Sequence, residues 1–98
     1  MPEIFDTNFQ GLERAMEIAT RRQEVIAQNI ANANTPGFEP LAFDEQLMRA
    51  VKRTEQREIN LEQELSSLTE NSVQYSSYIK LMTAKFNVLR TIATQGRR

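Results

Sequence analysis

Two long stretches of the chain carry apolar residues at alternating steps of four and three. The first row consists of Phe5, Phe9, Leu12, Met16, Ala19, Gln23, Ile26, Ile30 and Ala33, in which only Gln23 is polar. The second row consists of Leu61, Leu65, Leu68, Ser72, Tyr75, Ile79, Met82, Phe86, Leu89 and Ala93. Rows of this period lie along one side of an α-helix and favour left-handed supercoiling of paired helices. They predict helices over roughly residues 8–33 and 60–96.

Each expected helix also carries a second, thinner apolar row. Ile18 and Val25 form it in the first helix. Tyr78, Leu81, Val88 and Ile92 form it in the second. A helix with two apolar sides touches more than one neighbour. Periodicity does not say whether those neighbours belong to the same chain. An intramolecular helical hairpin and packing between protomers are therefore both possible interpretations. The second rows and the small size favour contacts between chains.

The predicted fold class is therefore all-α, with two terminal helices paired as an antiparallel, coiled-coil-like hairpin. The expected segments are residues 1–34 for the N-terminal helix, 35–59 for a turn and connecting segment with a short helix, and 60–98 for the C-terminal helix. Asn60, followed three residues later by Gln63, has the pattern of a capping box at the start of the second helix. Gly96 is the expected stop.

The end of the first helix has a strong turn signal. Asn34 is the expected left-handed residue just past the last turn, because Asn tolerates that conformation. Thr35 precedes Pro36 and is driven toward extended geometry. Pro36 and Gly37 fit the central positions of a type II turn. The sequence thus predicts a turn over Asn34, Thr35, Pro36, Gly37 and Phe38.

The connecting segment contains weaker signals. Residues 38–43 are expected to be extended, since Pro40 disfavours both a helix and a central strand. Asp44 could cap a short helix over Glu45 to Arg53, with Leu47, Met48 and Val51 as its apolar face. Residues 54–58 are charged and unpatterned, as in a linker. Phe38 and Phe43 are expected to pack the loop onto the helices.

Composition excludes several classes of function but does not identify one. A chain of 98 residues without cysteine or histidine is one small domain or one protomer, with a marginal core of its own. The net charge of −1 gives no field that would attract nucleic acid. No apolar run approaches the length of a membrane span, so no direct membrane insertion is expected, and no cleavable signal peptide is recognised.

Charge is nevertheless uneven along the chain. Residues 1–40 hold six acids and three bases, whereas residues 61–98 hold three acids and five bases. Acids near the start of a helix and bases near its end suit the helix dipole, which is the preferred explanation.

Catalytic and metal-binding signals are not found in the sequence. There is no histidine, no cysteine and no glycine-rich phosphate loop. The acidic pairs Glu13 with Glu17 and Glu62 with Glu64 lie on helix faces expected to be solvated, whereas carboxylate catalysis needs a buried pair. We expect neither an enzyme nor a protein that binds a cofactor or a metal.

The segment Ala27-Gln28-Asn29-Ile30-Ala31-Asn32-Ala33-Asn34-Thr35-Pro36-Gly37-Phe38 adds a family resemblance. Together with the amphipathic stretch before it, this segment resembles the N-terminal signature of the bacterial flagellar rod and hook proteins. The resemblance covers roughly the first forty residues and, through the tail from Tyr75 to Gly96, the last thirty-five. A run of this length is far more specific than a lone glycine motif.

The resemblance implies a structural subunit of the flagellar basal body, in the proximal rod. Members of this family leave the cell through the flagellar type III export apparatus without a cleavable signal. The implied partners are other rod proteins, further copies of the chain itself and the proteins at the junction of membrane ring and rod. In the family, the terminal helices are disordered before assembly, then pair and pack in layers of the rod, which spans the periplasm and transmits torque.

The resemblance also assigns roles to residues. The expected assembly interface is Leu12, Met16, Ile26, Asn29, Ile30, Asn32, Leu68, Tyr75, Ile79, Phe86 and Leu89. The amides of Asn29 and Asn32 would bond across a subunit boundary, whereas residue chemistry alone favours a fraying helix end. The alternative function, from a different class, is a free-standing helical hairpin that acts as an adaptor or a chaperone-like binding protein.

Overall fold

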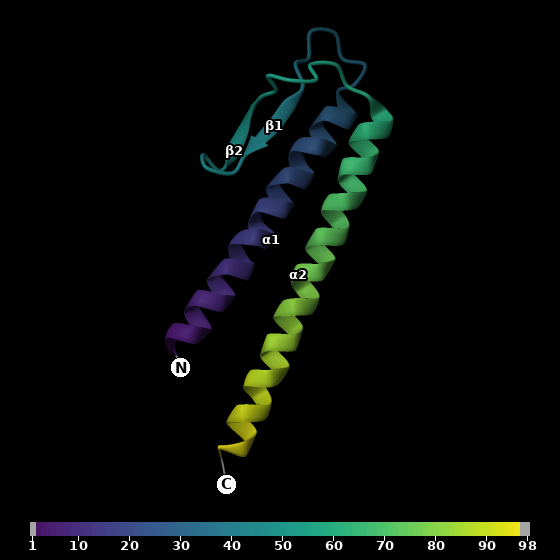
Figure 1. Ribbon diagram of the computed structural model, residues 1–98. Coiled ribbons are helices and arrows are strands. Elements are labelled where there is room, and N and C mark those ends of the chain that lie inside the picture. The colour runs from purple at the N-terminus through teal and green to yellow at the C-terminus, as the bar shows by residue number, and fades with distance from the viewer. Residues whose placement is uncertain (1, 97–98) are drawn as a thin grey trace.

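The computed structural model describes residues 2–96, and the side chains of residues 9–96. The chain forms four elements, α1 (Pro2–Ala31), β1 (Leu41–Asp44), β2 (Arg49–Lys52) and α2 (Leu61–Gln95) (Figure 1). The prediction of two long helices is confirmed. The first begins earlier than expected, at Pro2, and proline suits a first helical position because its missing N–H has no partner there in any case.

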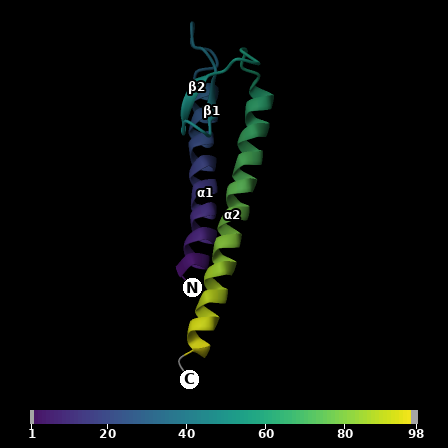
Figure 2. The same ribbon diagram turned by 60° about the vertical axis from the view of Figure 1, so that its left-hand side comes forward.

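The two helices lie side by side along the whole molecule. The chain runs along α1 in one direction and returns along α2, so both ends of the described chain lie at the same end of the rod-shaped molecule (Figures 1 and 2). The molecule measures 66 × 24 × 16 Å and has a radius of gyration of 18.2 Å. A compact domain of about 100 residues would have a radius near 13 Å. The fold is therefore strongly elongated.

Both ends of α2 lie where the sequence predicts them. The side-chain oxygen of Asn60 accepts hydrogen bonds from the backbone N–H groups of Glu62 and Gln63, at 3.0 and 3.3 Å. At the other end, the N–H of Gly96 donates to the carbonyl of Ile92 at 3.0 Å. The expected cap and the expected stop are both confirmed, although Gly96 has ordinary helical φ (−68°) rather than the left-handed value.

The end of α1 differs in detail from the prediction. The helix ends at Ala31, and Asn34 is not left-handed, so its predicted capping role is wrong. Asn32 takes that place, because its Nδ2 donates to the carbonyl of Gln28 (2.9 Å) and its Oδ1 accepts from the Thr35 hydroxyl (3.2 Å). The turn itself is confirmed, since the Phe38 N–H donates to the Thr35 carbonyl at 3.2 Å and Gly37 has φ of +78°.

The predicted short helix over residues 45–53 is wrong. This segment is the loop and second strand of an antiparallel hairpin, in which Leu41 faces Lys52 and Asp44 faces Arg49 (Figure 1). Asp44 Oδ1 does accept from the N–H groups of Gln46 and Leu47, as a helix cap would. Met48 then takes φ of +52°, which reverses the chain into β2. The all-α class therefore needs the addition of a two-stranded sheet.

The core is small and belongs to α1. Among the described residues the buried apolar side chains are Phe9, Ala19, Val25 and Ile26. The accessible surface is 7607 Å², whereas a compact folded protein of 11.3 kDa would expose about 5,700 Å². The protomer thus leaves much more surface uncovered than a self-sufficient domain.

Candidate assembly surface

The contact between the two helices has an aromatic end and a polar middle. Near the free ends, the rings of Phe9 and Phe86 lie 4.9 Å apart at a tilt of 58°, which is a favourable aromatic arrangement. Farther along, Asn71 of α2 is buried and donates from Nδ2 to the carbonyl of Ala19 (2.6 Å) and to Gln23 Oε1 (3.2 Å). The side of α2 that faces α1 therefore includes Asn71, which lies outside the predicted second row, and only the half-buried members of that row, such as Leu68, Tyr75 and Leu89, turn toward α1.

This polar layer is not fully satisfied. The hydroxyl of Ser72 also donates to Gln23 Oε1, at 3.5 Å, so the polar interruptions of the two rows lie together. Asn71 Oδ1, in contrast, is buried and has no hydrogen-bond partner among residues 9–96. A buried, unpaired oxygen lowers the stability of the pair. A polar residue in a helical seam typically specifies alignment at the expense of stability.

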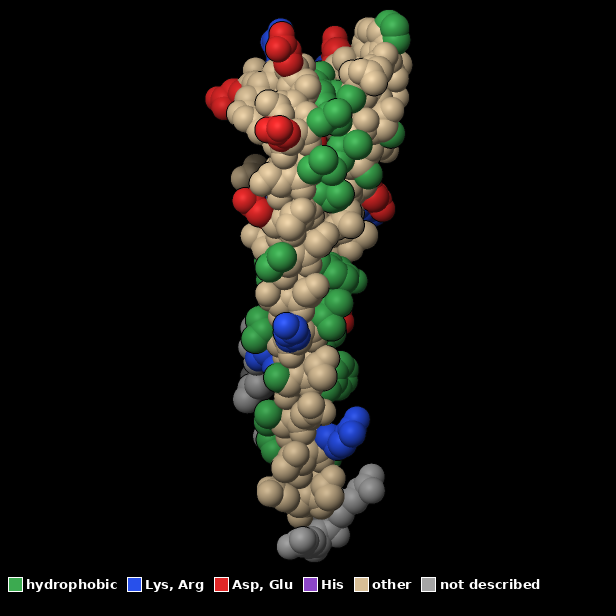
Figure 3. Space-filling view, turned by 90° about the vertical axis from the view of Figure 1, so that its right-hand side faces the viewer, with side chains coloured by type: hydrophobic (Ala, Val, Ile, Leu, Met, Phe, Trp, Pro, Cys, Tyr) green, Lys and Arg blue, Asp and Glu red, His purple; other side chains and the backbone are tan. Residues whose placement is uncertain are grey.

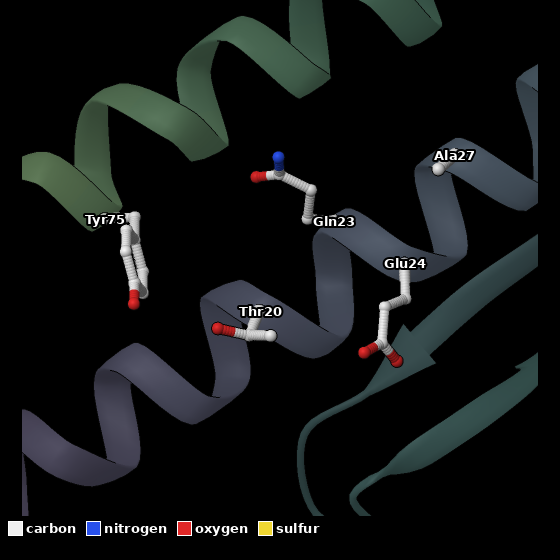
Figure 4. Close-up of a pocket in the computed structure, with 5 residues that line it drawn as sticks. All are labelled: Thr20, Gln23, Glu24, Ala27 and Tyr75. Carbon is white, nitrogen blue, oxygen red and sulfur yellow. The ribbon is translucent and has the colours of Figure 1, made fainter.

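A shallow hollow lies beside the polar layer. Thr20, Gln23, Glu24 and Ala27 of α1 line it together with Tyr75 of α2 (Figure 4). Its volume is about 320 Å³, and it is open to solvent. The small side chains of Thr20 and Ala27 leave the space, and the acid Glu24 lies at its border. The hollow resembles the gap that a side chain of a neighbouring helix fills rather than an enclosed ligand site.

The amide of Asn29 has a role that sequence reasoning missed. This side chain is fully buried, with 0% of its surface exposed. Its Nδ2 donates to the Leu41 carbonyl at 2.9 Å, and its Oδ1 accepts from the Leu41 N–H at 2.8 Å. The amide thus pairs with β1 as a neighbouring strand would. Its hydrogen bonds lie inside the chain, not across the subunit boundary that was expected.

The far end of the hairpin is held on α1 by charge. Glu45, in the hairpin loop, forms an ion pair with Arg22, and its carbonyl accepts from Arg14 at 3.5 Å. Val25, from the second apolar row of α1, is buried between these attachments. A hollow beside it is lined in part by Phe43 and Met48 of the hairpin. The second side of α1 is therefore covered by the chain's own hairpin.

A second feature missed from the sequence joins the connecting segment to α2. Arg53 Nη2 lies 2.7 Å from Glu64 Oε1, and the two side chains are 19% and 5% exposed. Arg53 also donates to the Gln56 carbonyl at 3.3 Å. The prediction that Glu64 lies on a solvated face is wrong, because this ion pair lets the carboxylate be buried. The eleven-residue separation across an irregular segment gave no sequence signal.

The predicted interface residues divide by burial. Ile26 and Asn29 are buried within the chain. Half-buried members are Leu12, Met16, Ile30, Asn32, Leu68, Tyr75 and Leu89. Ile79 and Phe86 are exposed. The structure contains one chain, so the assembly role of this set remains a prediction.

The exposed large apolar side chains mark a different surface. They are Leu47, Leu61, Leu65, Val73, Ile79, Leu81, Phe86, Val88 and Ile92, all between 42% and 61% exposed. Eight of these nine belong to α2. Figure 3 shows green side chains along this side of the molecule, with basic side chains between them in the lower half. At 100° per residue they lie on more than one side of α2, with Leu61, Leu65, Ile79 and Phe86 on one side and Leu81, Val88 and Ile92 on another. Exposed apolar surface of this extent is typical of protein–protein contacts.

Other kinds of site find no support in the described part of the chain. Residues 2–96 contain no group of three acidic or metal-ligating side chains that could hold a metal ion. No helix in that range is long and apolar enough to cross a membrane. Glu13, Glu17 and Glu62 are exposed, as expected for acids on solvated helix faces.

Comparisons with known proteins place similarity in the first helix and over most of the chain. The model of the flagella basal body rod protein family matches residues 9–38, which comprise most of α1 and the turn after it. A curated relative from Bacillus subtilis (strain 168) is 24% identical over 127 residues, covering 96% of this chain and 98% of the relative. Another, from Proteus mirabilis (strain HI4320), is 39% identical over 44 residues, covering 45% of this chain and 32% of the relative.

The chain is thus similar to flagellar basal-body rod proteins. Both relatives are named "Flagellar basal body rod protein FlgB", so within that class the similarity is to FlgB. The alignment with the Bacillus protein spans more positions than the 98 residues of this chain, which means that the relative contains residues without a counterpart here. The family is a structural one, in keeping with the surface described above.

Proposed function

We propose that this chain is a structural subunit of the proximal rod, and that its two long helices assemble through coiled-coil-like packing. The observation that carries the proposal is the exposed apolar surface of α2, on which eight large apolar side chains are uncovered, whereas α1 buries four. Apolar surface of this extent is stabilised by burial against other chains. The family match over residues 9–38 supports other flagellar rod components as those chains.

The mechanism is mechanical. Helices of 30 and 35 residues extend about 45 and 53 Å, so each subunit contributes long elements to a tubular layer. Side chains interlocked at close-packed density resist sliding and rotation, and such packing transmits torque. The partners are other rod proteins, copies of the chain and the proteins at the ring–rod junction. No catalytic step is involved.

The small core also fits export before assembly. A protomer with few buried apolar side chains has little folding free energy of its own and can pass through a type III export apparatus unfolded. Packing against neighbours then supplies the missing burial, so the helix content rises on association. The proposed location is accordingly the rod within the basal body.

Co-purification tests this function. A tagged chain in its native host should appear in detergent-extracted hook–basal bodies, in a constant ratio to the ring proteins. A chain that stays in the soluble fraction as a folded helical species would contradict the rod assignment and support the helical-hairpin adaptor. Circular dichroism over a dilution series separates the two as well, because only the rod subunit should lose helix on dilution.

The variant Ile30→Asp adds a test of the packing. Ile30 lies near the end of α1 and is half-buried. A charge buried there on assembly costs several kcal/mol, so this variant should be absent from purified basal bodies. Normal rods that contain it would rule out packing through this row.

A further inference from the structure

The C-terminal half of α2 has more apolar surface than α1 covers. Met82 and Leu89 are half-buried, while Leu81, Val88 and Ile92 are exposed. At 100° per residue, Leu81 and Val88 lie about 120–140° around the helix from Tyr75, which lines the hollow beside α1. We define the outer row as Leu81, Val88 and Ile92. No part of residues 9–96 covers it.

The outer row is bordered by positive charge. With Leu81 and Val88 as seam positions seven residues apart, Lys80 and Lys85 occupy the flanking positions that select the partner in helical pairs. Neither lysine forms an ion pair within the described residues. From Asn71 to Gly96 the helix contains no acidic residue at all. The partner of this row should therefore present acids on both sides of a receptive surface.

The hollow on α1 has the complementary properties. Thr20 and Ala27 give it depth, and the exposed acid Glu24 lines it. The exposed acid Glu17 lies seven residues before Glu24, on the same side of α1. Glu24 forms no ion pair within residues 9–96, and Glu17 has only an exposed partner, Arg21, at 4.0 Å. The chain thus carries both an apolar row with basic flanks and a hollow with an acidic border.

We infer that the outer row of one copy packs into the hollow of the next, with Lys80 and Lys85 beside Glu17 and Glu24 of that neighbouring copy. The two surfaces lie on different sides of the molecule, so one copy cannot satisfy its own hollow. A contact between two different surfaces can repeat from copy to copy. This inference rests on the proposed function, because it names the contact by which rod subunits of this kind associate.

Charge and area both favour a second copy as the partner. An outer row packed against another outer row would bring four lysines together with no acid nearby. The protomer exposes roughly 1,900 Å² more than a compact protein of its mass. A stable interface removes about 800 Å² from each partner. Two contacts per copy, one through each surface, would use most of the excess.

Charge reversal with mutual rescue is the test. Glu17→Lys/Glu24→Lys makes the hollow basic, and Lys80→Glu/Lys85→Glu makes the outer row acidic. Each double variant alone should self-associate about tenfold more weakly than the wild type in sedimentation velocity, because two attractions between opposite charges become repulsions. An equimolar mixture of the two should regain wild-type association, since each row then meets a hollow of opposite charge.

The matched control is Glu55→Lys/Glu58→Lys, which makes the same charge change in the exposed connecting segment. This control should associate as the wild type does. Failure of the mixture to recover, or an equal loss in the control, would overturn the contact. Recovery in the mixture also excludes misfolding of either double variant as the cause of its weaker self-association.

Basal-body purification separates this inference from the proposed function. If the wild-type chain co-purifies with the rod and both reversal variants do so equally well, the contact is wrong and the rod function stands. If the wild-type chain does not co-purify, the rod function itself fails, whatever the variants do.

Discussion

The two helices carry similar apolar rows, yet the fold treats them differently. Four apolar side chains and the amide of Asn29 are buried on α1, which lies between the hairpin and α2. On α2 the only buried described residues are polar, Glu64 and Asn71. An apolar row therefore does not define a core by itself. What decides burial is the number of neighbours that one chain can supply, and this chain supplies two for α1 and one for α2.

The largest expected effect is the difference in stability between a charge placed on α1 and the same charge placed on α2. Ile26→Asp would bury an unpaired charge between α1 and its neighbours, so it should lower the free energy of unfolding by about 3–5 kcal/mol. Ile79→Asp places the charge at an exposed position of α2 and should lower the free energy of unfolding much less. Thermal unfolding followed by circular dichroism, at a concentration where the wild type is helical, measures both. Equal losses would mean that α2 is as buried as α1.

The next effect concerns the buried end of α2. Arg53→Met leaves the Glu64 carboxylate without its partner and should destabilise the fold by about 3 kcal/mol. The matched variant is Lys52→Met, which removes an exposed ion pair with Glu39 and should change stability little. Urea unfolding of both variants makes the comparison. Similar urea midpoints for the two variants would show that the buried Arg53–Glu64 pair contributes no more to stability than the exposed Lys52–Glu39 pair.

The hairpin attachment comes third. Asn29→Ala removes both hydrogen bonds to the Leu41 backbone and should lower stability by about 2 kcal/mol. Hydrogen exchange at the Leu41 N–H should become much faster, because the hairpin loses its polar contact with α1. Asn32→Ala, whose amide bonds at the helix end, should leave that exchange rate unchanged. A slow Leu41 N–H in the Asn29 variant would contradict the attachment.

The smallest effect is electrostatic. The hydrogen bond and charge of Lys52 lower the pKa of the exposed Glu39 below its ordinary value. The ion pair is therefore fully present above the usual glutamate range and is lost as pH falls through the lowered pKa. In Lys52→Met, an NMR titration should show the pKa of Glu39 rising toward the ordinary value. An unchanged titration would mean that the pair does not persist in solution.

Local signals in the sequence were sufficient for several features. Proline and glycine at 36 and 37 predicted the type II turn, since their allowed φ values match its two central positions. Asn60 predicted the start of α2 through its capping oxygen. The rows of period 3.5 predicted both long helices. The side of α2 that meets α1 was predicted only in part, because Leu61, Leu65 and Ile79 of the second row are exposed and Asn71, outside the row, is buried against Ala19. Each of these rests on chemistry within a few residues.

Features that join distant segments could not be predicted. The pairing of Asn29 with Leu41 and of Arg53 with Glu64 depends on how the connecting segment folds back. That segment was itself misjudged, because Asp44 makes the same hydrogen bonds at a helix start and in this hairpin loop. Leu47, Met48 and Val51 have helical spacing, and only the left-handed φ of Met48 separates the two outcomes.

The polar layer at Gln23 and Asn71 fixes the axial offset between the helices. A slide of α2 by seven residues, about 10.5 Å, would keep apolar rows face to face. It would also replace Asn71 opposite the Ala19 carbonyl by Glu64 or Tyr78, and the carboxylate of Glu64 could not donate to that carbonyl. The hydrogen bond from Asn71 to the Ala19 carbonyl therefore favours one axial setting of the two helices. A polymer built from this hairpin inherits a single repeat distance, set by one amide near the middle of the protomer.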